Sequence, residues 1–204
     1  MSRMGTATLA TREGGPAAPV EGRMVDAALR CVARWGVAKT TLDDIAREAG
    51  CSRATAYRLF PGGKEALLAA VAAHEVRRLL DDLTARLEEA EGLEDRLVAG
   101  ITTASRAIAG HEAVRYLLAH EPGVVLRHVT FAPYDAVLTA ASTFLAPWFE
   151  PWVGPSLAAR AGEWVTRLVL SFSLSPSPRF DFTDDGDTRR FVVRYLLPGL
   201  VPPA

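Results

Sequence analysis

Side chains that can bind phosphate oxygens and base edges are concentrated in one short stretch, from Thr40 to Lys64. Its middle, from Ser52 to Arg58, combines three hydroxyl groups with two guanidinium groups within seven residues. Hydroxyl groups position a protein on the sugar–phosphate backbone, and the planar fork of an arginine matches the edge of a guanine. The chemistry that this stretch indicates is recognition of double-stranded DNA.

Two short helices with a tight turn between them are expected to position these side chains. The apolar spacing predicts a helix from Leu42 to Ala49, for which the Thr41 hydroxyl is the N-cap. Gly50 permits a sharp reversal, and Ser52 caps a second helix over residues 53–60. Such a pair is a helix-turn-helix, whose second helix enters the major groove of DNA.

The rest of the chain also has helical periodicity. Apolar residues three and four apart predict a helix over 21–35, closed by Gly36, and a long helix over 64–90. Further helices are expected at 94–109, 112–120, 123–130, 134–149, 156–174 and 188–197, with a non-helical connection over 175–187. Because almost no stretch alternates with period two, the expected fold class is all-α: a three-helix DNA-binding head followed by a C-terminal helical domain.

Three parts of the chain are expected. Residues 1–20 are rich in Gly, Pro, Thr and Ala without a sustained period, which predicts a flexible N-terminal arm. The DNA-binding head then occupies residues 21–80, and the C-terminal domain occupies residues 81–204.

Charge is unevenly distributed along a chain of ordinary globular composition. The 204 residues are 49% apolar and 23% charged, and the formal net charge is -1. Residues 1–70 carry ten Lys and Arg against seven Asp and Glu, whereas residues 71–204 carry thirteen against seventeen. The sign of this asymmetry favours an N-terminal part that meets an anion.

The expected compartment is the cytoplasm. No apolar run approaches the roughly 18–20 residues that span a bilayer, and the start of the chain lacks the apolar core of a signal peptide. Cys31 and Cys51 fit a reducing compartment. The four histidines show no paired metal-ligand spacing, so we expect no structural metal and no cofactor.

Several short motifs follow one another in a fixed order through the N-terminal part. They are Trp35-Gly36, Thr40-Thr41-Leu42, Ile45-Ala46, Ala49-Gly50, Ser52, Thr55, Tyr57, Phe60 and Lys64-Glu65-Ala66-Leu67. With these motifs, residues 23–71 resemble the DNA-binding domain of the TetR/AcrR family of bacterial transcriptional regulators. The resemblance implies a regulator that binds a near-palindromic DNA operator as a homodimer.

The resemblance also implies roles within the head. Arg53 is expected to read a base edge, and Thr41, Ser52 and Tyr57 are expected to bind phosphate oxygens. Lys64 would add its charge to the positive end of the long helix. The expected DNA-contacting residues are Thr40, Thr41, Ser52, Arg53, Thr55, Tyr57, Arg58, Gly62, Gly63 and Lys64.

One departure from the family lies between Phe60 and Lys64. The step Pro61-Gly62-Gly63 is one residue longer here than is common in the family. It leaves two candidates for the phosphate contact at this point: the ammonium group of Lys64, or the backbone amides of Gly62 and Gly63.

By the same resemblance, residues 81–204 form a ligand-binding and dimerisation domain. This region is dense in large aromatic side chains, which suit an apolar pocket for a small hydrophobic or amphipathic effector. Arg115 is one candidate polar anchor. The other expected pocket residues are Arg106, Tyr116, His120, Arg127, Phe131, Tyr134, Phe144, Trp148, Trp152 and Phe172.

An apolar stripe on the last two helices is expected to pair with its copy in a second subunit. The stripe comprises Trp164, Leu168, Phe172, Phe191, Tyr195, Leu196 and Leu200. Two-fold symmetry would then place two recognition helices about 34 Å apart, facing successive major grooves.

The leading hypothesis is therefore a repressor that a small molecule releases from DNA. Two alternatives remain open: a ligand-independent activator or architectural DNA-binding protein with the same head, and an enzyme that uses the C-terminal cavity. Against an enzyme, the sequence offers no Ser-His-Asp grouping, no glycine-rich phosphate loop and no metal cluster.

Overall fold

The computed structural model describes residues 19–126 and 132–200, with the side chains of residues 132–134 excepted. Every regular element in these residues is helical, which confirms the all-α fold class. The N-terminal part contains α1 (Val20–Lys39), α2 (Leu42–Glu48), α3 (Arg53–Leu59) and α4 (Gly63–Glu89). The C-terminal part contains α5 (Gly92–Gly110), α6 (Glu112–His120), α7 (Pro122–Leu126), α8 (Ala132–Leu174), α9 (Asp185–Phe191), the π-helical turn η1 (Val192–Leu196) and α10 (Leu197–Leu200). The predicted N-terminal arm lies, except for its last two residues, outside the described residues.

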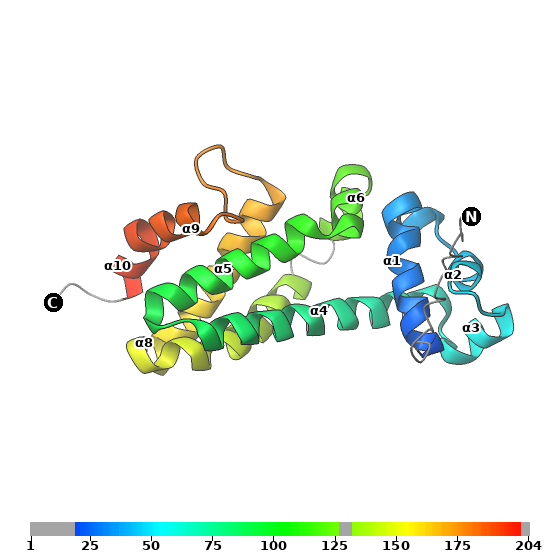
Figure 1. Ribbon diagram of the computed structural model, residues 1–204, viewed down its shortest axis with the longest axis horizontal. Helices are drawn as coiled ribbons and strands as arrows, with labels where there is room; N and C mark the ends of the chain where they lie inside the picture. The colour runs from blue at the N-terminus through cyan, green and yellow to red at the C-terminus, as the bar shows by residue number, and fades with distance from the viewer. Residues whose placement is uncertain (1–18, 127–131, 201–204) are drawn as a thin grey trace, which may run out of the picture.

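Helices α1, α2 and α3 form a small head at one end of an elongated molecule, and α4 runs from this head along the C-terminal helices (Figure 1). Helix α4 contributes to two hydrophobic cores. Leu67 and Val71 pack in the core of the head, whereas Leu83 and Leu87 pack in the C-terminal core. The predicted domain boundary after residue 80 therefore falls inside a continuous helix, and it stays a prediction.

Small side chains allow the helices of the head to pack closely. Ala27 and Ala28 of α1 and Ala56 of α3 have no exposed surface, and Ala46 of α2 is 2% exposed. Ile45 of α2 fills the space that these residues leave and is itself fully buried. Because the core is formed from the inner faces of all these helices, the polar residues of α3 are left on its outer face.

The two predicted N-caps of the helix-turn-helix are confirmed. The Thr41 hydroxyl accepts the Asp44 backbone N–H at 3.2 Å, and the Asp44 carboxylate accepts the Thr41 backbone N–H at 3.2 Å, which completes a capping box. The Ser52 hydroxyl accepts the Thr55 backbone N–H at 3.1 Å. Gly50 has a φ of 64°, as its place in the turn requires.

Thr41→Ala should lower the free energy of unfolding by about 1 kcal/mol, because it removes the side-chain acceptor at the start of α2. The hydrogen bonds from the Thr41 hydroxyl and backbone hold the pKa of Asp44 below its usual value of 3.8. Because the pKa of Asp44 is lower in the folded state, the ionised carboxylate stabilises the folded protein at pH values above its pKa in the unfolded chain. This contribution disappears as the pH falls through the pKa of the folded state. Urea denaturation at pH 7 and pH 3 measures both effects.

Thr139→Ala is the matched control, since the Thr139 hydroxyl is exposed and donates only to the Asp135 carbonyl within its own helix. It should leave stability unchanged or slightly increased, because alanine favours helix more than threonine does. An equal loss in both variants would contradict the capping role of Thr41.

Helix α8 joins two segments that the sequence predicted as separate helices, 134–149 and 156–174. They are continuous except for a bend at Gly154, where φ is 74°. Pro155 follows this bend, and its lack of an amide hydrogen removes one helical hydrogen bond there. Neither α8 nor any other described helix combines the length and apolar character that crossing a membrane requires.

The end of the chain differs from the prediction at its boundaries. The expected helix over 188–197 begins earlier, at Asp185, because the Asp184 side chain accepts the Asp187 backbone N–H at 2.9 Å and caps it. The helix then widens into η1 before α10. The expected helix over 123–130 is described only as the short α7, because residues 127–131 lie outside the described residues.

Candidate nucleic-acid interface

The outer face of α3 presents the basic and aromatic side chains that the sequence singled out. Ala56 points into the head and is fully buried, whereas the Arg53 side chain is 71% exposed and Tyr57 is 42% exposed. Arg58 is also exposed, and Thr55 is half-buried. A helix that buries only its small residues can approach a DNA groove with its long side chains extended toward it.

Arg53 is held in place before any DNA arrives. Its guanidinium group pairs with the Asp43 carboxylate of α2 at 3.1 Å and lies over the Tyr57 ring, 5.3 Å from the centroid. The two contacts order a long side chain at the N-terminal end of α3. Binding of a base edge by Arg53 therefore competes with its ion pair to Asp43.

The hydroxyl groups of the interface have partners within the protein. Ser52 and Thr55 hydroxyl oxygens lie 2.9 Å apart at the start of α3, and the exposed Thr41 hydroxyl belongs to the capping box of α2. Only one of the two hydrogens of the Ser52–Thr55 pair is used between them, so the other can donate to a phosphate oxygen, whereas the Thr41 hydroxyl already donates its one hydrogen to the Asp44 carboxylate. Their assignment as phosphate-binding groups remains a prediction.

Thr40 does not lie on this surface. It is fully buried, and its hydroxyl donates to the Gly36 carbonyl at 2.6 Å. The side chain closes the bend between α1 and α2 instead of facing solvent. We therefore remove Thr40 from the proposed DNA contacts.

The step before α4 bears on the two candidates that the sequence left open for a phosphate contact. The Lys64 ammonium group donates to the Val37 carbonyl at 3.1 Å, which turns it back toward the end of α1. The Gly63 amide donates to the Phe60 carbonyl at 2.9 Å, with a φ of 71° at Gly63. Gly62 is exposed, and its amide makes no hydrogen bond within the described residues. Of the two candidates for this phosphate contact, the backbone at Gly62 fits better than the Lys64 side chain.

A second polar cluster, which the sequence did not reveal, joins the head to the C-terminal domain. The Glu121 carboxylate, just after α6, accepts the backbone N–H groups of Val37 at 3.0 Å and Ala38 at 3.3 Å. Gly36 adopts φ 79° and ψ 173° beside it, and a Cβ atom there would lie 2.1 Å from Glu121 Oε1. We call this group of contacts the Glu121 clamp. No local pattern could have indicated it, because its partners lie 83 and 84 residues apart in the sequence.

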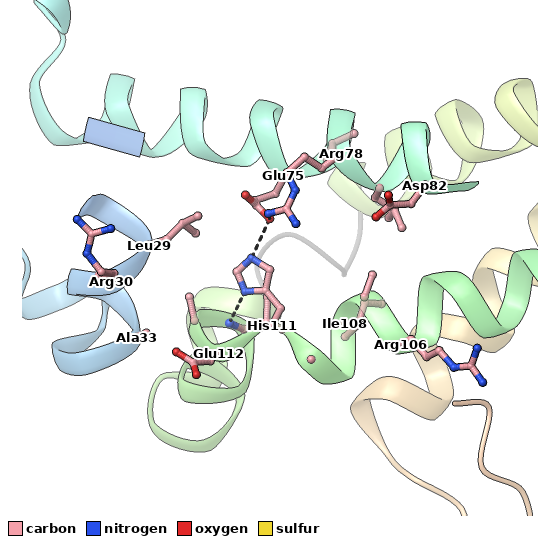
Figure 2. A pocket seen from close by; sticks show the side chains of 16 residues that line it. Leu29, Arg30, Ala33, Glu75, Arg78, Asp82, Arg106, Ile108, His111 and Glu112 are labelled. Carbon is pink, nitrogen blue, oxygen red and sulfur yellow. Dashed lines mark hydrogen bonds and ion pairs between the residues drawn. The ribbon is translucent and has the colours of Figure 1, made fainter. Parts of the chain in front are cut away.

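A cleft of about 540 Å³ lies between α1, α4, the end of α5 and the start of α6. Figure 2 shows Leu29 and Arg30 of α1 on one side, Glu75 and Arg78 of α4 on another, and His111 next to Glu75. His111 Nε2 lies 3.3 Å from Glu75, and its Nδ1 accepts the backbone N–H at the first turn of α6. Helix α6 is thus tied to α1 by Glu121 and to α4 by His111.

A second cavity, of about 520 Å³, lies within the C-terminal domain between α5, α6, the end of α8 and the 175–184 connection. We call it the α5–α8 cavity. Residues that line it include Ser105, Ile108, Arg115, Phe172, Phe180 and Phe182. Arg115 and Phe172 were expected pocket residues, whereas Ser105 and the two phenylalanines of the connection were not.

Comparison with known proteins agrees with the geometry of the head. The family model described as bacterial regulatory proteins, tetR family, matches residues 24–71, from α1 into α4. An uncharacterized HTH-type transcriptional regulator of Mycobacterium tuberculosis, Rv1255c, is 29% identical over 182 residues, which are 88% of this chain and 85% of that protein. The DNA-binding head of this chain belongs to the TetR family.

Solved structures show the same fold. The fatty acid degradation regulator FadR from Bacillus halodurans has a TM-score of 0.63 and 16% identity, covering 89% of this chain and 98% of its own. AibR, solved in complex with isovaleryl coenzyme A and operator DNA, has a TM-score of 0.56 and 19% identity, covering 91% and 100%. The family match and the names of its relatives identify this chain as a DNA-binding transcriptional regulator.

Most of the expected pocket residues of this TetR-family chain do not line the α5–α8 cavity. Tyr116 stacks on His120 at 4.3 Å between centroids, and Tyr116 lies beside Gly36 at the head. Arg106 donates to the Thr183 carbonyl at 2.7 Å and pairs with Asp185. These side chains stabilise junctions between elements.

The aromatic residues of α8 also have structural partners. The Arg96 guanidinium lies over the rings of Trp148 and Trp152, 5.5 and 4.6 Å from their centroids, and Phe144 packs against the C-terminal core. We therefore reassign Trp148, Trp152 and Phe144 from the predicted pocket to packing contacts. Of the remaining predicted pocket residues, Arg127 and Phe131 lie outside the described residues, as does the side chain of Tyr134.

The predicted dimer stripe divides into exposed and internal residues. Trp164 is 53% exposed and Tyr195 is 55% exposed, whereas Leu200 is only 6% exposed. Phe172 stacks on Phe182, and Phe191 packs edge-on against the same ring. We correct Leu200 to an interior position. Phe172 and Phe191 are half-buried, as are Leu168 and Leu196, and all four stay with Trp164 and Tyr195 in the predicted interface.

Proposed function

We propose that this regulator is a cytoplasmic repressor, which binds a near-palindromic operator as a homodimer and leaves it when a small molecule occupies the C-terminal domain. The observation that carries the proposal is the outer face of α3, where Arg53, Tyr57 and Arg58 extend from a helix whose one buried residue, Ala56, faces the head. Exposed cationic and aromatic groups on a second helix of this kind suit the major groove.

The apolar surface at the end of the chain supports the homodimer. Trp164 of α8 and Val193 and Tyr195 of η1 are each about half exposed, at 53%, 48% and 55%. Large exposed apolar side chains near the end of the chain suit a contact with a second protein. We propose that a second copy of the chain covers this surface, so that the dimer has two DNA-binding heads. Two-fold symmetry then requires a near-palindromic operator.

The Glu121 clamp supports release by a ligand. A ligand changes DNA affinity only if it binds one arrangement of the two heads better than the other. Helix α6 contributes Arg115 to the α5–α8 cavity, and Glu121 just beyond its end binds the backbone of the head. A ligand that displaces α6 would therefore move the head. AibR, which was solved with both an acyl coenzyme A and operator DNA, supports the joint use of this fold for ligand and DNA.

A gel-shift experiment with the DNA upstream of the protein's own gene tests the proposal. The wild type should give a sequence-specific band, and sedimentation should show two protein chains per operator. Arg53→Ala combined with Tyr57→Ala should weaken operator binding by at least about 30-fold, because each residue provides a DNA contact of about 1–3 kcal/mol.

Arg160→Ala is the matched control, since Arg160 is an exposed arginine of α8, far along the chain from the head. It should leave the operator affinity unchanged. Absence of a specific band at low salt, or unchanged binding by the double variant, would overturn the proposed function.

A further inference from the structure

The hydroxyl group of Ser105 is buried in α5 without a hydrogen-bond partner in the described part of the chain. Ser105 is only 5% exposed, and it lines the α5–α8 cavity. Several other helical hydroxyls of this protein donate to the carbonyl four residues earlier, as Thr84 does at 2.8 Å and Thr166 at 2.9 Å. A buried hydroxyl without a partner destabilises the folded state, so a ligand atom that binds it gains the missing hydrogen bond.

The guanidinium group of Arg115, on α6, lines the same cavity and has no ion pair or hydrogen bond within the described residues. The acidic group that lines the same cavity, Asp181, already accepts the Thr183 backbone N–H at 2.8 Å and the Thr183 hydroxyl at 2.7 Å. These hydrogen bonds lower the pKa of Asp181. Arg115 is exposed and its guanidinium group has no carboxylate partner among the described residues, so it can pair with the anionic group of a ligand.

Aromatic rings form the apolar wall between these polar groups. Phe172 and Phe182 stack at 4.2 Å with an angle of 20° between their planes, and Phe180 packs edge-on against Phe191 at 5.2 Å. Their mutual contacts hold the rings in fixed positions. A cavity of about 520 Å³ is in the range of small-molecule sites, and flat aromatic walls favour a flat apolar ligand.

We propose that the α5–α8 cavity binds a hydroxylated aromatic carboxylate, with its carboxylate on Arg115, its ring against Phe172 and Phe182, and its hydroxyl on Ser105. This assignment rests on the proposed function, because the bound acid would be the effector of the repressor. Since Arg115 and the Glu121 clamp belong to the same helical segment, occupancy of the cavity acts directly on the contact that fixes the head.

Titration calorimetry on the full chain without DNA tests the binding site. The probes are 3-(4-hydroxyphenyl)propionate, its neutral amide, and 3-phenylpropionate, which lacks the ring hydroxyl. The hydroxy acid should bind most tightly. The amide should bind roughly 10- to 100-fold more weakly, because it loses a charge-assisted pair, and 3-phenylpropionate roughly 5- to 10-fold more weakly, because it loses one hydrogen bond.

Two variants assign these losses to residues. Arg115→Gln should weaken the hydroxy acid to the affinity of the amide and leave the amide unchanged. Ser105→Ala should weaken the hydroxy acid to the affinity of 3-phenylpropionate, without loss of thermal stability, because it removes an unpaired buried hydroxyl. Thr102→Val is the matched control: its hydroxyl is also buried and unpaired among the described residues of α5, but it does not line the cavity.

The outcomes separate this site from the proposed function. Equal affinity of the three probes, no binding of any of them, or variants without the stated pattern would overturn the site. Binding of the hydroxy acid with that pattern supports the site even if operator DNA stays bound in a gel-shift. That combination would overturn the proposed release of DNA by a ligand and leave the binding site intact. Release of DNA by the hydroxy acid from both wild type and Arg115→Gln at equal concentrations would support the repressor and overturn the site.

Discussion

Replacing Gly36 by alanine is expected to detach the DNA-binding head from the C-terminal domain. The new Cβ would lie 2.1 Å from Glu121 Oε1 and 3.0 Å from the Tyr116 ring, so the carboxylate must leave the amides of Val37 and Ala38. Gly36 also has φ 79° with ψ 173°, a conformation that residues with a side chain rarely adopt. The combined loss should be roughly 2–4 kcal/mol of unfolding free energy.

Gly50→Ala separates the two causes of this loss. Gly50 has a similar φ of 64°, but a Cβ atom there would meet no atom within 4 Å. Its substitution should cost only the backbone strain, about 1 kcal/mol. Urea denaturation measures both variants, and hydrogen exchange of the Val37 and Ala38 amides measures the clamp itself. Equal costs, or unchanged exchange in Gly36→Ala, would show that Glu121 does not fix the head.

The parts of the head that the sequence predicted depend on neighbours in the chain. Thr41 and Asp44 are three residues apart, as are Ser52 and Thr55, so their spacing alone determines both caps. Gly50 likewise permits a turn whose geometry involves only adjacent residues. For these features the helix hydrogen-bonding pattern sets the structure, and the sequence displays it.

Tertiary packing places two of the predicted DNA contacts differently from the sequence pattern. Thr40 is polar and stands beside the cap residue, but it is fully buried at the bend after α1, where its hydroxyl donates to the Gly36 carbonyl four residues earlier. Lys64, one of the two candidates for its phosphate contact, donates to the carbonyl of Val37, 27 residues earlier. Periodicity describes one helix at a time, so it cannot identify contacts that depend on how two helices meet.

The aromatic residues of the C-terminal domain also could not be assigned from periodicity. By sequence alone, Phe172, Trp148 and Trp152 are equivalent large apolar residues. The structure separates them, because Phe172 stacks on Phe182 at a cavity wall while both tryptophans hold the Arg96 guanidinium. Ser105 carried no signal at all, since an isolated serine within a helix has significance only once its hydroxyl is known to lack a partner.

Replacing Arg53 by alanine is expected to remove the main sequence-reading contact of the head. The side chain is 71% exposed at the start of α3 and is oriented by Asp43 and Tyr57, so it is ready to bind a base edge. One bidentate arginine–guanine contact discriminates by about 1–3 kcal/mol, which corresponds to roughly 5- to 150-fold in operator affinity. Affinity for unrelated DNA should fall much less, because phosphate contacts dominate there.

Two further variants make this expectation specific to Arg53. Arg58→Ala removes an exposed arginine from the last turn of the same helix, and it should weaken operator and unrelated DNA alike, since a phosphate contact carries no sequence information. Asp43→Asn removes the carboxylate that competes for the Arg53 guanidinium, so it should strengthen binding to both kinds of DNA. Fluorescence anisotropy with an operator duplex and a scrambled duplex, over a series of salt concentrations, distinguishes the three patterns. If Arg53→Ala lowered both affinities by the same factor, Arg53 would bind phosphate, and the base-reading contact would have to come from another residue of α3.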